Sequence, residues 1–503
     1  MIPMILEWIT YLLLAVVVYN LIVYLNHVYD LKDYPPGPFP LPLIGNLHCI
    51  DFKRPHKTYQ KLTKAYGDVF SISFGMERIV MVNTIEQAKE ALVTKSAEFA
   101  GRPSNHHAFA MITRNYQDLV FADYGSHWLL VRKLAIRSLK MYANLDGKLE
   151  VKVAQEVEQM NGRLMEKTNE PVNLNVEIRL FMTNIISTIV LGERYENIEN
   201  PTFQKILELN NYLHYAVYHG DPISISKWQK YLPIHSTRML SSYLAKRDEH
   251  FRNVFNKHKT NLKPEMLKNM LDLFIHTSSD EEFLKKNGIS ELTRDTIEMV
   301  MMDLLDASVD NTAVTLSWIV LYLLHHPKYM REAYNEIKHM VGAKKYPKMS
   351  DQSSLPLVQA IIQETLRLAI GPLSLPHKST KDSSLNGKSI KKDTQVLFHI
   401  WNIHRDERYW NDPEIFKPER WIDENGNFAP NICKSYLPFL MGKRVCFGEQ
   451  IARTELFIAL TRLLVDFHIE PESGLLPSLT DVTIGVNQYM TPLYKVILRK
   501  RDV

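Results

Sequence analysis

Apolar residues recur at intervals of three and four over long stretches of the chain, which predicts that amphipathic helices dominate the fold. The clearest such stretches are residues 147–165 and 356–368. Short alternating runs at residues 70–74 and 79–82 instead predict two strands of a small sheet. We therefore expect a mainly α fold with a small β portion.

The longest predicted helix begins after Thr293, a suitable N-cap, and continues to His325, where Pro327 stops it. At ~1.5 Å per residue this helix is about 50 Å long, enough to cross a whole domain. Its middle is apolar on most sides but carries Asp306 and Asp310. Polar side chains in a buried helix need partners, so we expect a function for this segment.

The first 28 residues are predicted to form a signal-anchor transmembrane helix. Residues 8–25 are apolar except for Thr10 and Asn20, and eighteen helical residues span roughly 27 Å, close to the ~30 Å hydrocarbon core of a bilayer. Basic residues, Lys32 and Lys53 among them, follow the span, which predicts a cytosolic main body. A cleaved signal peptide and a buried core helix are the alternatives. A signal peptide has a shorter apolar core, a basic start and a small-residue cleavage site.

Residues 29–46 are predicted to be a stiff proline-rich hinge, because each proline fixes φ and pushes the preceding residue out of the helical region. A ligand for another protein's proline-binding domain is the alternative. The polar stretch 276–290 is expected to be a surface loop, with helical patterning resuming on both sides. Residues 47–503 are therefore expected to form one large domain.

Composition narrows the class of protein only a little. The 503 residues carry a net charge of +4, which is too balanced to indicate nucleic acid as a partner. The three cysteines, Cys49, Cys433 and Cys446, show no CxxC or disulfide-type spacing. This pattern favours a reduced, cytosolic environment for the main body.

Candidate chemistry is concentrated at Cys446, in the run FLMGKRVCFG that starts at Phe439. Gly442 and Gly448 permit close backbone approach on either side of the sulfur. A buried thiolate needs a metal ion or donated hydrogen bonds to keep its charge. A helix predicted over residues 449–464 also starts just after it, with its positive dipole end near the sulfur. The alternative is an inert buried cysteine in a glycine-containing turn.

This motif resembles the F-x-x-G-x-R-x-C-x-G loop of the cytochrome P450 family, and three further motifs support the resemblance. They are Glu364-Thr365-Leu366-Arg367, the segment 416–421 with Arg420, and Trp128-Leu129-Leu130-Val131-Arg132. The resemblance covers essentially the whole chain. It implies a single P450-type domain that holds heme b through a cysteine thiolate, the ligand that favours O–O cleavage. Glu364, Arg367 and Arg420 are then a structural network.

The family pattern also assigns the heme contacts. Cys446 is the expected iron ligand, with Phe439 in the same loop. The propionates, which need cationic or hydrogen-bond donors, are assigned to Trp128, Arg132, His377 and Arg444. Any one of these cations, taken alone, could equally be an ordinary surface residue.

The resemblance further implies an external electron donor, because no GxGxxG nucleotide fold is present in the chain. NADPH–cytochrome P450 reductase is expected, with cytochrome b5 as a second candidate donor. A basic run on the helix that carries Trp128, together with Lys443, predicts a docking face for such an acidic partner. The residues of the run are Arg132, Lys133, Arg137 and Lys140. A solvated basic surface without a partner is the alternative.

The oxygen-activation motif departs from the family pattern. The family's acid is present as Asp310, but Asn311 stands where a threonine is expected, followed by Thr312. An amide donates hydrogen bonds but is no hydroxyl relay. Three alternatives stay open. The enzyme carries out ordinary oxygenation through an ordered water with help from Thr312, or it catalyses unusual chemistry of an isomerase, dehydratase or oxime type, or it is impaired. Asp306 is either a contact for a substrate cation or donor, or the partner of a nearby basic residue.

Residues 98–103, the anchor and the His377 segment look most like the animal microsomal branch that handles steroids and xenobiotics. The leading function is monooxygenation of a small lipophilic substrate at the endoplasmic reticulum membrane. A heme sensor without catalysis is a further alternative. The pocket is expected around residues 106–115, 210–220 and 483–490.

Overall fold

The structure is a computed structural model that describes residues 2–104, 106–143, 148–218, 235–343, 345–369, 376–472, 474, 476–480 and 492–501. The chain divides into two compact units. The first comprises Met1–Pro103, Ser374–Asp406 and Met441–Arg444. The second comprises Ser104–Leu373, Glu407–Leu440 and Val445–Val503.

The first unit contains a four-stranded sheet with the order β1-β2-β7-β4. Buried Phe70, Ile72, Ile79 and Met81 of the first two strands form its core, and Leu62 of a neighbouring helix packs on them. The strands are β1 (Val69–Phe74), β2 (Glu77–Val82), β4 (His377–Lys378) and β7 (Gln395–Phe398), with β5 (Ser383–Leu385) and β6 (Lys388–Ile390) forming a separate hairpin. The helices are α1 (Ile2–Tyr29), η1 (Asp30–Asp33), η2 (Leu47–Cys49), α2 (Pro55–Tyr66), α3 (Ile85–Lys89), the π-helical turn η3 (Glu90–Thr94), α15 (Ile400–Ile403) and η8 (Gly442–Arg444).

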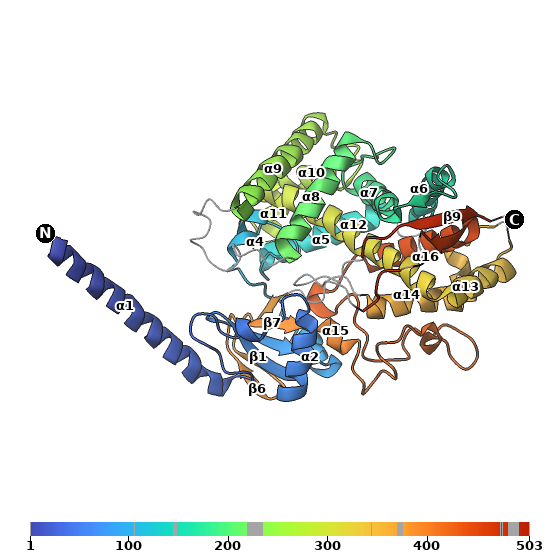
Figure 1. Cartoon of the computed structure of the whole chain (residues 1–503). Coiled ribbons are helices and arrows are strands. Elements are labelled where there is room, and N and C mark those ends of the chain that lie inside the picture. Colours follow the sequence, from blue (N-terminus) through green and yellow to red (C-terminus); the bar gives the residue numbers. More distant parts are fainter. Residues whose placement is uncertain are drawn as a thin grey trace. The chain divides into compact units, whose positions relative to one another are not determined.

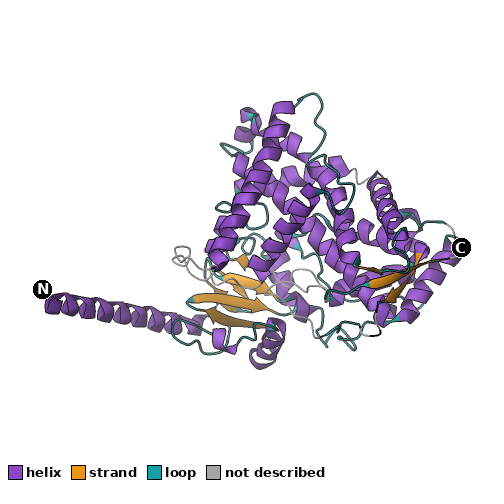
Figure 2. Cartoon of the chain, turned by 45° about the horizontal axis from the view of Figure 1, so that its top comes forward, coloured by secondary structure: helices purple, strands orange, loops and turns teal. Residues whose placement is uncertain are grey.

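The second unit is mostly helical, with one small sheet of order β3-β9-β8 near the C-terminus (Figures 1 and 2). Its strands are β3 (Pro171–Val172), β8 (Phe467–Pro471) and β9 (Val496–Lys500). Its helices are α4 (His107–Ile112), α5 (Ser126–Ala143), α6 (Lys148–Met165), α7 (Leu174–Val190), α8 (Pro201–Tyr218), α9 (His235–Asn261), α10 (Met270–Ser278), α11 (Glu281–Lys286), α12 (Arg294–His325), α13 (Pro327–Met340), η6 (Met349–Ser354), α14 (Pro356–Leu368), η7 (Pro418–Trp421) and α16 (Glu449–Asp466).

Most of the predicted elements are confirmed. The helices α6, α14 and α16 and the strands β1 and β2 all occur at the predicted positions. The side chain of Thr293 caps α12 by accepting a hydrogen bond from the backbone N–H of Thr296. The expectation of a surface loop at residues 276–290 is wrong, because α10 and α11 lie there. The Asp280 side chain caps α11 and Leu284 is buried, so a six-residue helix forms that is too short to show a clear period.

The helix α12 forms the centre of the second unit and packs along α7. From Thr296 to Leu324 every residue is buried except Asp306, Ala307, Ser308 and Asn311. A helix that is surrounded on all sides has no polar face, which explains why most of its residues are apolar. These four residues form the accessible patch of α12, which overlaps the oxygen-activation motif that contains Asn311.

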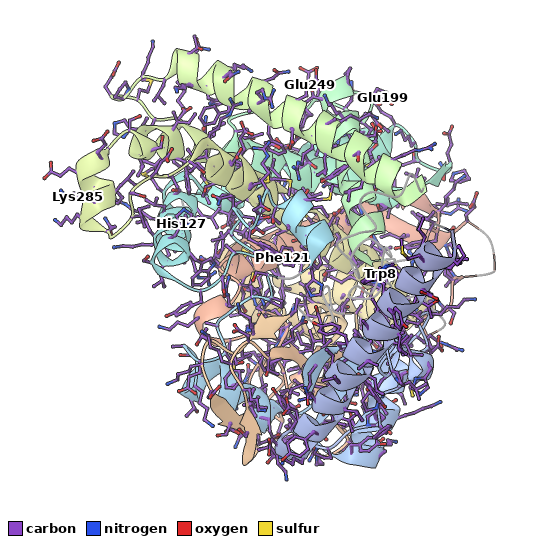
Figure 3. The ribbon with its side chains drawn as sticks, turned by 90° about the vertical axis from the view of Figure 1, so that its left-hand side faces the viewer. Trp8, Phe121, His127, Glu199, Glu249 and Lys285 are labelled. Carbon is purple, nitrogen blue, oxygen red and sulfur yellow. The ribbon has the colours of Figure 1, made fainter. Side chains whose placement is uncertain are left out.

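Two helices, α1 and α12, are long and apolar enough to cross a membrane, among the residues that the structure describes. Most of α12 is buried inside the second unit, so its apolarity is explained by the protein core. The side chains of α1 are exposed instead: Trp8, labelled in Figure 3, is 70% exposed. The predicted boundaries of the anchor (1–28), the hinge (29–46) and the catalytic domain (47–503) stay predictions.

Candidate functional site

The Cys446 loop is shaped by backbone hydrogen bonds. The N–H of Cys446 donates to the carbonyl of Phe439 at 2.9 Å, and α16 begins three residues later. Burial of the sulfur and the charge of Glu449 raise the pKa of the Cys446 thiol, while the backbone N–H donors of Gly448 and Glu449 and the charge of Arg132 oppose this shift in part. The Cys446 side chain keeps exposed surface. The loop thus supplies part of the compensation that a thiolate needs and leaves room for a metal on the sulfur.

Cys446 matches a metal site in which the protein supplies one ligand and a cofactor supplies the others. Among the described residues, no three His, Cys, Asp or Glu side chains are grouped so that they could hold a metal ion. A single cysteine with donated backbone hydrogen bonds fits a heme, because the sulfur would hold the iron and the porphyrin would supply the nitrogen ligands.

In the predicted loop, Phe439 lies next to the helix that follows the cysteine. The guanidinium of Arg453, on α16, lies 5.0 Å from the centre of the Phe439 ring. The next residue, Leu440, has a φ of +57°, a left-handed conformation that is uncommon for a branched side chain. This backbone reversal lets the carbonyl of Phe439 accept the hydrogen bond from Cys446.

Trp128 and Arg132 lie one turn apart on α5 and both face inward. The indole N–H of Trp128 donates to the carbonyl of Leu119 at 3.0 Å. Arg132 donates to the carbonyl of Val445 at 2.5 Å and lies over the rings of Trp128 and Phe447. Burial lowers the pKa of Arg132, and the nearby Cys446 raises it. Arg132 therefore belongs to the cysteine loop, whereas the indole N–H already has an acceptor.

Arg132 consequently does not belong to the exposed basic face that the sequence predicted. Lys133, Arg137 and Lys140 are exposed on α5, whereas Arg132 is only partly exposed. Lys443, in the first unit, is also exposed.

His377 and Arg444 come together in the first unit, where Arg102 joins them. His377 is fully buried, with Nδ1 2.7 Å from the carbonyl of Phe99. Arg444 donates to the carbonyl of Ala100 at 2.9 Å. Burial and then the charge of Arg102 hold the pKa of His377 well below its usual value, and Arg444 adds to the effect. Three potential cations therefore share one buried region.

The other ring nitrogen of His377 provides a test of whether these residues fit a heme. Nε2 is buried and has no hydrogen-bond partner among the described residues, although buried polar atoms are almost always paired. An anionic carboxylate beside it would raise the pKa of His377 and turn Nε2 into a charged donor. This orphan atom, together with the neighbouring arginines, fits a heme propionate.

Glycine is required at position 442 in the same unit. Its φ is +76°, and a Cβ there would lie 1.7 Å from the carbonyl oxygen of Leu92. Any side chain would force the turn η8, and with it Arg444, out of place.

On α12, the predicted acid Asp310 is buried and forms an ion pair with Arg179 of α7. Arg179 also donates to Oδ1 of Asn175 at 2.9 Å. Sequence reasoning missed Arg179. The signal was available, because Arg179 is the one basic residue in the otherwise apolar run 178–182, and buried charges in a core helix need a partner.

Asn311 and Thr312 point their polar groups to different partners. The amide of Asn311 donates to the carbonyl of Ala307 at 3.0 Å, within the helix. Thr312 is buried and hydrogen-bonds to Glu455 of α16. Burial raises the pKa of Glu455 well above its usual value, and the bond to Thr312 lowers it in part. Of the three predicted catalytic residues, only Asn311 keeps accessible surface.

Asp306 lies one turn earlier and lines a small pocket of about 20 Å³. Burial and the neighbouring Asp310 raise the pKa of Asp306 to about 8, and Arg247 opposes this shift. The carboxyl group is therefore mainly protonated at neutral pH. The pocket is lined by Ile206, Leu209, Asn210, Tyr243, Arg247, His250, Phe251, Met302, Leu305 and Asp306. Asn210 begins one predicted pocket segment, and residues 483–490 lie outside the described residues.

The predicted structural network is complete. Glu364 and Arg367 are both fully buried and paired at 2.7 Å. Arg420 donates to the same carboxylate at 3.0 Å, and so do the indole N–H of Trp421 at 2.8 Å and the backbone N–H of Lys417 at 3.0 Å. One buried carboxylate thus joins α14 to the segment that contains η7.

The Cytochrome P450 family profile matches residues 35–492. Among curated relatives, the steroid 17-alpha-hydroxylase/17,20 lyase of Ictalurus punctatus is 31% identical over 495 residues, covering 97% of this chain and 95% of the relative. The enzymes of the same name from Papio cynocephalus and Felis catus are 32% and 33% identical, each covering 89% of both chains.

These matches extend over almost the full length of the chain and of its relatives. They agree with the helical fold around α12, the cysteine loop and the buried Glu364 network. The family implies a heme bound through a cysteine thiolate and electrons from an NADPH-dependent reductase. The chain belongs to the cytochrome P450 family and is a heme-thiolate monooxygenase that acts on small lipophilic molecules.

Proposed function

We propose that this enzyme hydroxylates a steroid-like substrate, inserting one atom of dioxygen while the other leaves as water. The observation that carries the proposal is the near-full-length similarity to enzymes named steroid 17-alpha-hydroxylase/17,20 lyase. The isomerase, dehydratase or oxime-type reading had only Asn311 in its favour, and the relatives do not favour it.

In this proposal Cys446 is the iron ligand and Phe439 completes its loop. When bound, heme supplies the iron at which dioxygen is reduced and split. Arg444 and His377 hold propionates in the first unit, and His377 uses its unpartnered Nε2. Arg132 and Trp128 are assigned to the same role, although the indole N–H would have to give up its bond to Leu119.

Proton handling in this proposal is assigned to Asp310, Asn311 and Thr312 of α12, of which Asn311 is accessible. Asn311 holds a water molecule through its amide oxygen, because the amide N–H₂ is used within the helix. Asp310 is the acid of the family's oxygen-activation motif in this proposal, and Arg179 pairs with its carboxylate. Thr312 takes a supporting role, since its hydroxyl is bonded to Glu455.

The pocket chemistry supports a neutral, oxygen-bearing substrate over a cationic one. A protonated Asp306 can donate a hydrogen bond as well as accept one. Half of the residues that line the pocket are apolar, and Asn210, Tyr243, Arg247 and His250 are further polar groups. At about 20 Å³ the pocket has room for a single polar group of a ligand, and a keto or hydroxyl group of a steroid would suit it.

The proposed electron donor is NADPH–cytochrome P450 reductase, with cytochrome b5 as an additional donor, on the endoplasmic reticulum membrane. Lys133, Arg137 and Lys140 form an exposed basic surface on α5 that suits an acidic partner. The apolar and exposed α1 serves as the single-pass anchor. Reductase coupling should weaken as salt concentration rises.

The proposal is tested by reconstituting the full chain with reductase and lipid, and incubating it with steroids, fatty acids and small nitrogenous compounds. The expected result is NADPH-dependent gain of one oxygen atom by a steroid, read by mass spectrometry. Turnover without NADPH, or NADPH-dependent oxidation confined to the other two classes, would overturn it.

The role of Asn311 has its own test. Asn311→Thr restores a hydroxyl at the accessible position of α12, and it should raise product formed per NADPH consumed if Asn311 limits proton delivery. Thr315→Ser, one turn further along the same helix, is the matched control and should change neither quantity. An Asn311→Thr enzyme no better coupled than wild type contradicts a limiting role.

A further inference from the structure

Arg453, on α16, contacts the segment 436–439, which leads into the cysteine loop, at both of its ends. The guanidinium lies 5.0 Å from the centre of the Phe439 ring and donates a hydrogen bond to the hydroxyl of Tyr436. The carbonyl of Phe439 accepts the hydrogen bond from the N–H of Cys446 at 2.9 Å. A shift of Phe439 would therefore move the acceptor that shapes the backbone around the sulfur.

Two further hydrogen bonds connect the same guanidinium to α14 and to its own helix. Nη1 of Arg453 donates to Oε1 of Gln363 at 3.0 Å, and Nε donates to Oε1 of Glu449 at 2.8 Å. Gln363 is buried on α14, and its backbone carbonyl accepts from the hydroxyl of Tyr436 at 3.4 Å. The helices α14 and α16 pack against each other (Figure 1). One cation thus joins two helices to the segment before the cysteine.

These contacts distinguish Arg453 from an ordinary surface cation. The side chains of Arg453 and Glu449 are 32% and 40% exposed, and an i,i+4 pair with that exposure contributes little to stability by itself. The planar guanidinium holds several acceptors in fixed directions, which an ammonium group cannot do. An arginine that uses this fork on Gln363, Glu449 and Tyr436 at once is suited to positioning them.

Glu449 connects the same arginine to the electrostatics of the sulfur. The backbone N–H of Glu449 is one of the donors to the sulfur of Cys446, and the charge of the Glu449 side chain also acts on that sulfur. Arg453 pairs with this carboxylate and offsets its charge. A negative charge near an iron ligand favours the oxidised iron, whereas a positive charge favours the reduced iron, which carries one electron more.

We propose that Arg453 is a positioning residue that sets the reduction potential of the heme iron, by holding Phe439 in place and by offsetting the charge of Glu449 beside the sulfur. The proposal rests on the assignment of Cys446 as the iron ligand under the proposed function. The reduction potential determines how readily the iron accepts an electron from the reductase. Arg453 acts through its neighbours and is not a catalytic residue.

The test is a spectroelectrochemical titration of the ferric and ferrous forms of the full-length holoenzyme in detergent. In Arg453→Met the ratio of ferrous to ferric iron at a fixed potential should fall by about threefold or more. This change corresponds to about 28 mV at about 59 mV per tenfold for one electron. The midpoint potential should fall because a cation is lost and the charge of Glu449 is left without its partner.

Arg462→Met is the matched control. Arg462 is also on α16, lies 4.5 Å from the centre of the Tyr346 ring and donates to the carbonyl of Ala154 at 2.9 Å. Its replacement removes an arginine of the same helix with the same kind of ring contact, and it should leave the midpoint potential unchanged. Equal shifts in Arg453→Met and Arg462→Met overturn the proposal.

The sign of the shift in Glu449→Gln provides a second criterion, which holds even if Arg453→Met binds no heme. Glu449→Gln removes the negative charge, keeps the backbone donor and leaves Arg453 bound to Gln363, so it should raise the midpoint potential. Arg453→Lys keeps the charge and should recover at least half of the shift seen in Arg453→Met. An unchanged or lowered potential in Glu449→Gln overturns the proposal.

The reduced, carbon-monoxide-treated spectrum of each protein separates this proposal from the assignment of the iron ligand. A thiolate-type spectrum in all variants, together with the shifts described above, supports the role of Arg453. The same spectrum with an unmoved potential overturns the role of Arg453 alone. A wild-type protein without a thiolate-type spectrum overturns the ligand assignment and the role of Arg453 together.

Discussion

The buried ion pair between Arg179 and Asp310 allows a quantitative prediction. Their side chains are 6% and 3% exposed, so Arg179→Met leaves a buried carboxylate without the cation paired to it. Breaking a buried pair by removing one partner typically costs about 3–5 kcal/mol. Methionine keeps much of the aliphatic volume, so a cavity adds little to this loss.

The expected change in melting temperature follows from the length of the chain. An unfolding entropy of about 2.1 cal/mol/K per residue gives roughly 1 kcal/mol/K for 503 residues, so Arg179→Met should lower Tm by about 3–5 °C. The measurement is thermal unfolding by circular dichroism in detergent, at matched heme content. Arg194→Met is the control, because the Arg194 side chain is 40% exposed in its pair with Glu156. Arg194→Met should lower the free energy of unfolding by less than about 1 kcal/mol.

A double variant distinguishes the effect of an unpaired buried charge from the effect of losing the arginine side chain itself. In Arg179→Met/Asp310→Asn no buried charge is left uncompensated, so most of the stability should return. The reasoning is refuted if Arg179→Met is no worse than Arg194→Met, or if the double variant is as unstable as the single one.

Three further predictions concern other parts of the molecule. Glu364→Gln should lower the free energy of unfolding by about 3–5 kcal/mol, because the fully buried Arg367 loses its counter-charge. An unchanged midpoint of urea unfolding would contradict a stabilising role for this network. Gly442→Ala should reduce heme incorporation, measured as heme per protein, because the new Cβ meets the Leu92 carbonyl, whereas Gly125→Ala, with open space around its Cβ, should have no effect. Burial raises the pKa of Asp306 from its ordinary value of 3.8 to about 8 in the folded state, so its contribution to stability is fully present below about pH 4 and is lost as pH rises to 8. The Tm of Asp306→Asn relative to wild type should therefore rise between pH 5 and pH 9, and a flat difference would refute the shift.

Helical periodicity and caps were sufficient to predict the main elements. Thr293 at the start of α12 and Pro327 after its end are local signals that tertiary contacts did not alter. The short helix α11 was missed because six residues show less than two turns of a pattern. The division into two compact units could not be read from the sequence, since the first unit gathers three separate segments.

The candidate site was predictable where a motif is contiguous and not where partners come from distant segments. The Cys446 loop and the Glu364 network could be proposed from their spacing. The partners of Asp310 and Thr312, which are Arg179 and Glu455, lie on α7 and α16 and follow only from helix packing. Likewise, the sequence offered Arg132 for a docking face, but aromatic and backbone contacts turn it inward.

The identity of the iron ligand is the central claim, and a spectrum of the reduced, carbon-monoxide-treated protein tests it most directly. Cys446→Ser should lose the thiolate-type spectrum, while Cys433→Ser should keep it. A thiolate-type spectrum that survives in Cys446→Ser and disappears in Cys433→Ser would contradict the assignment.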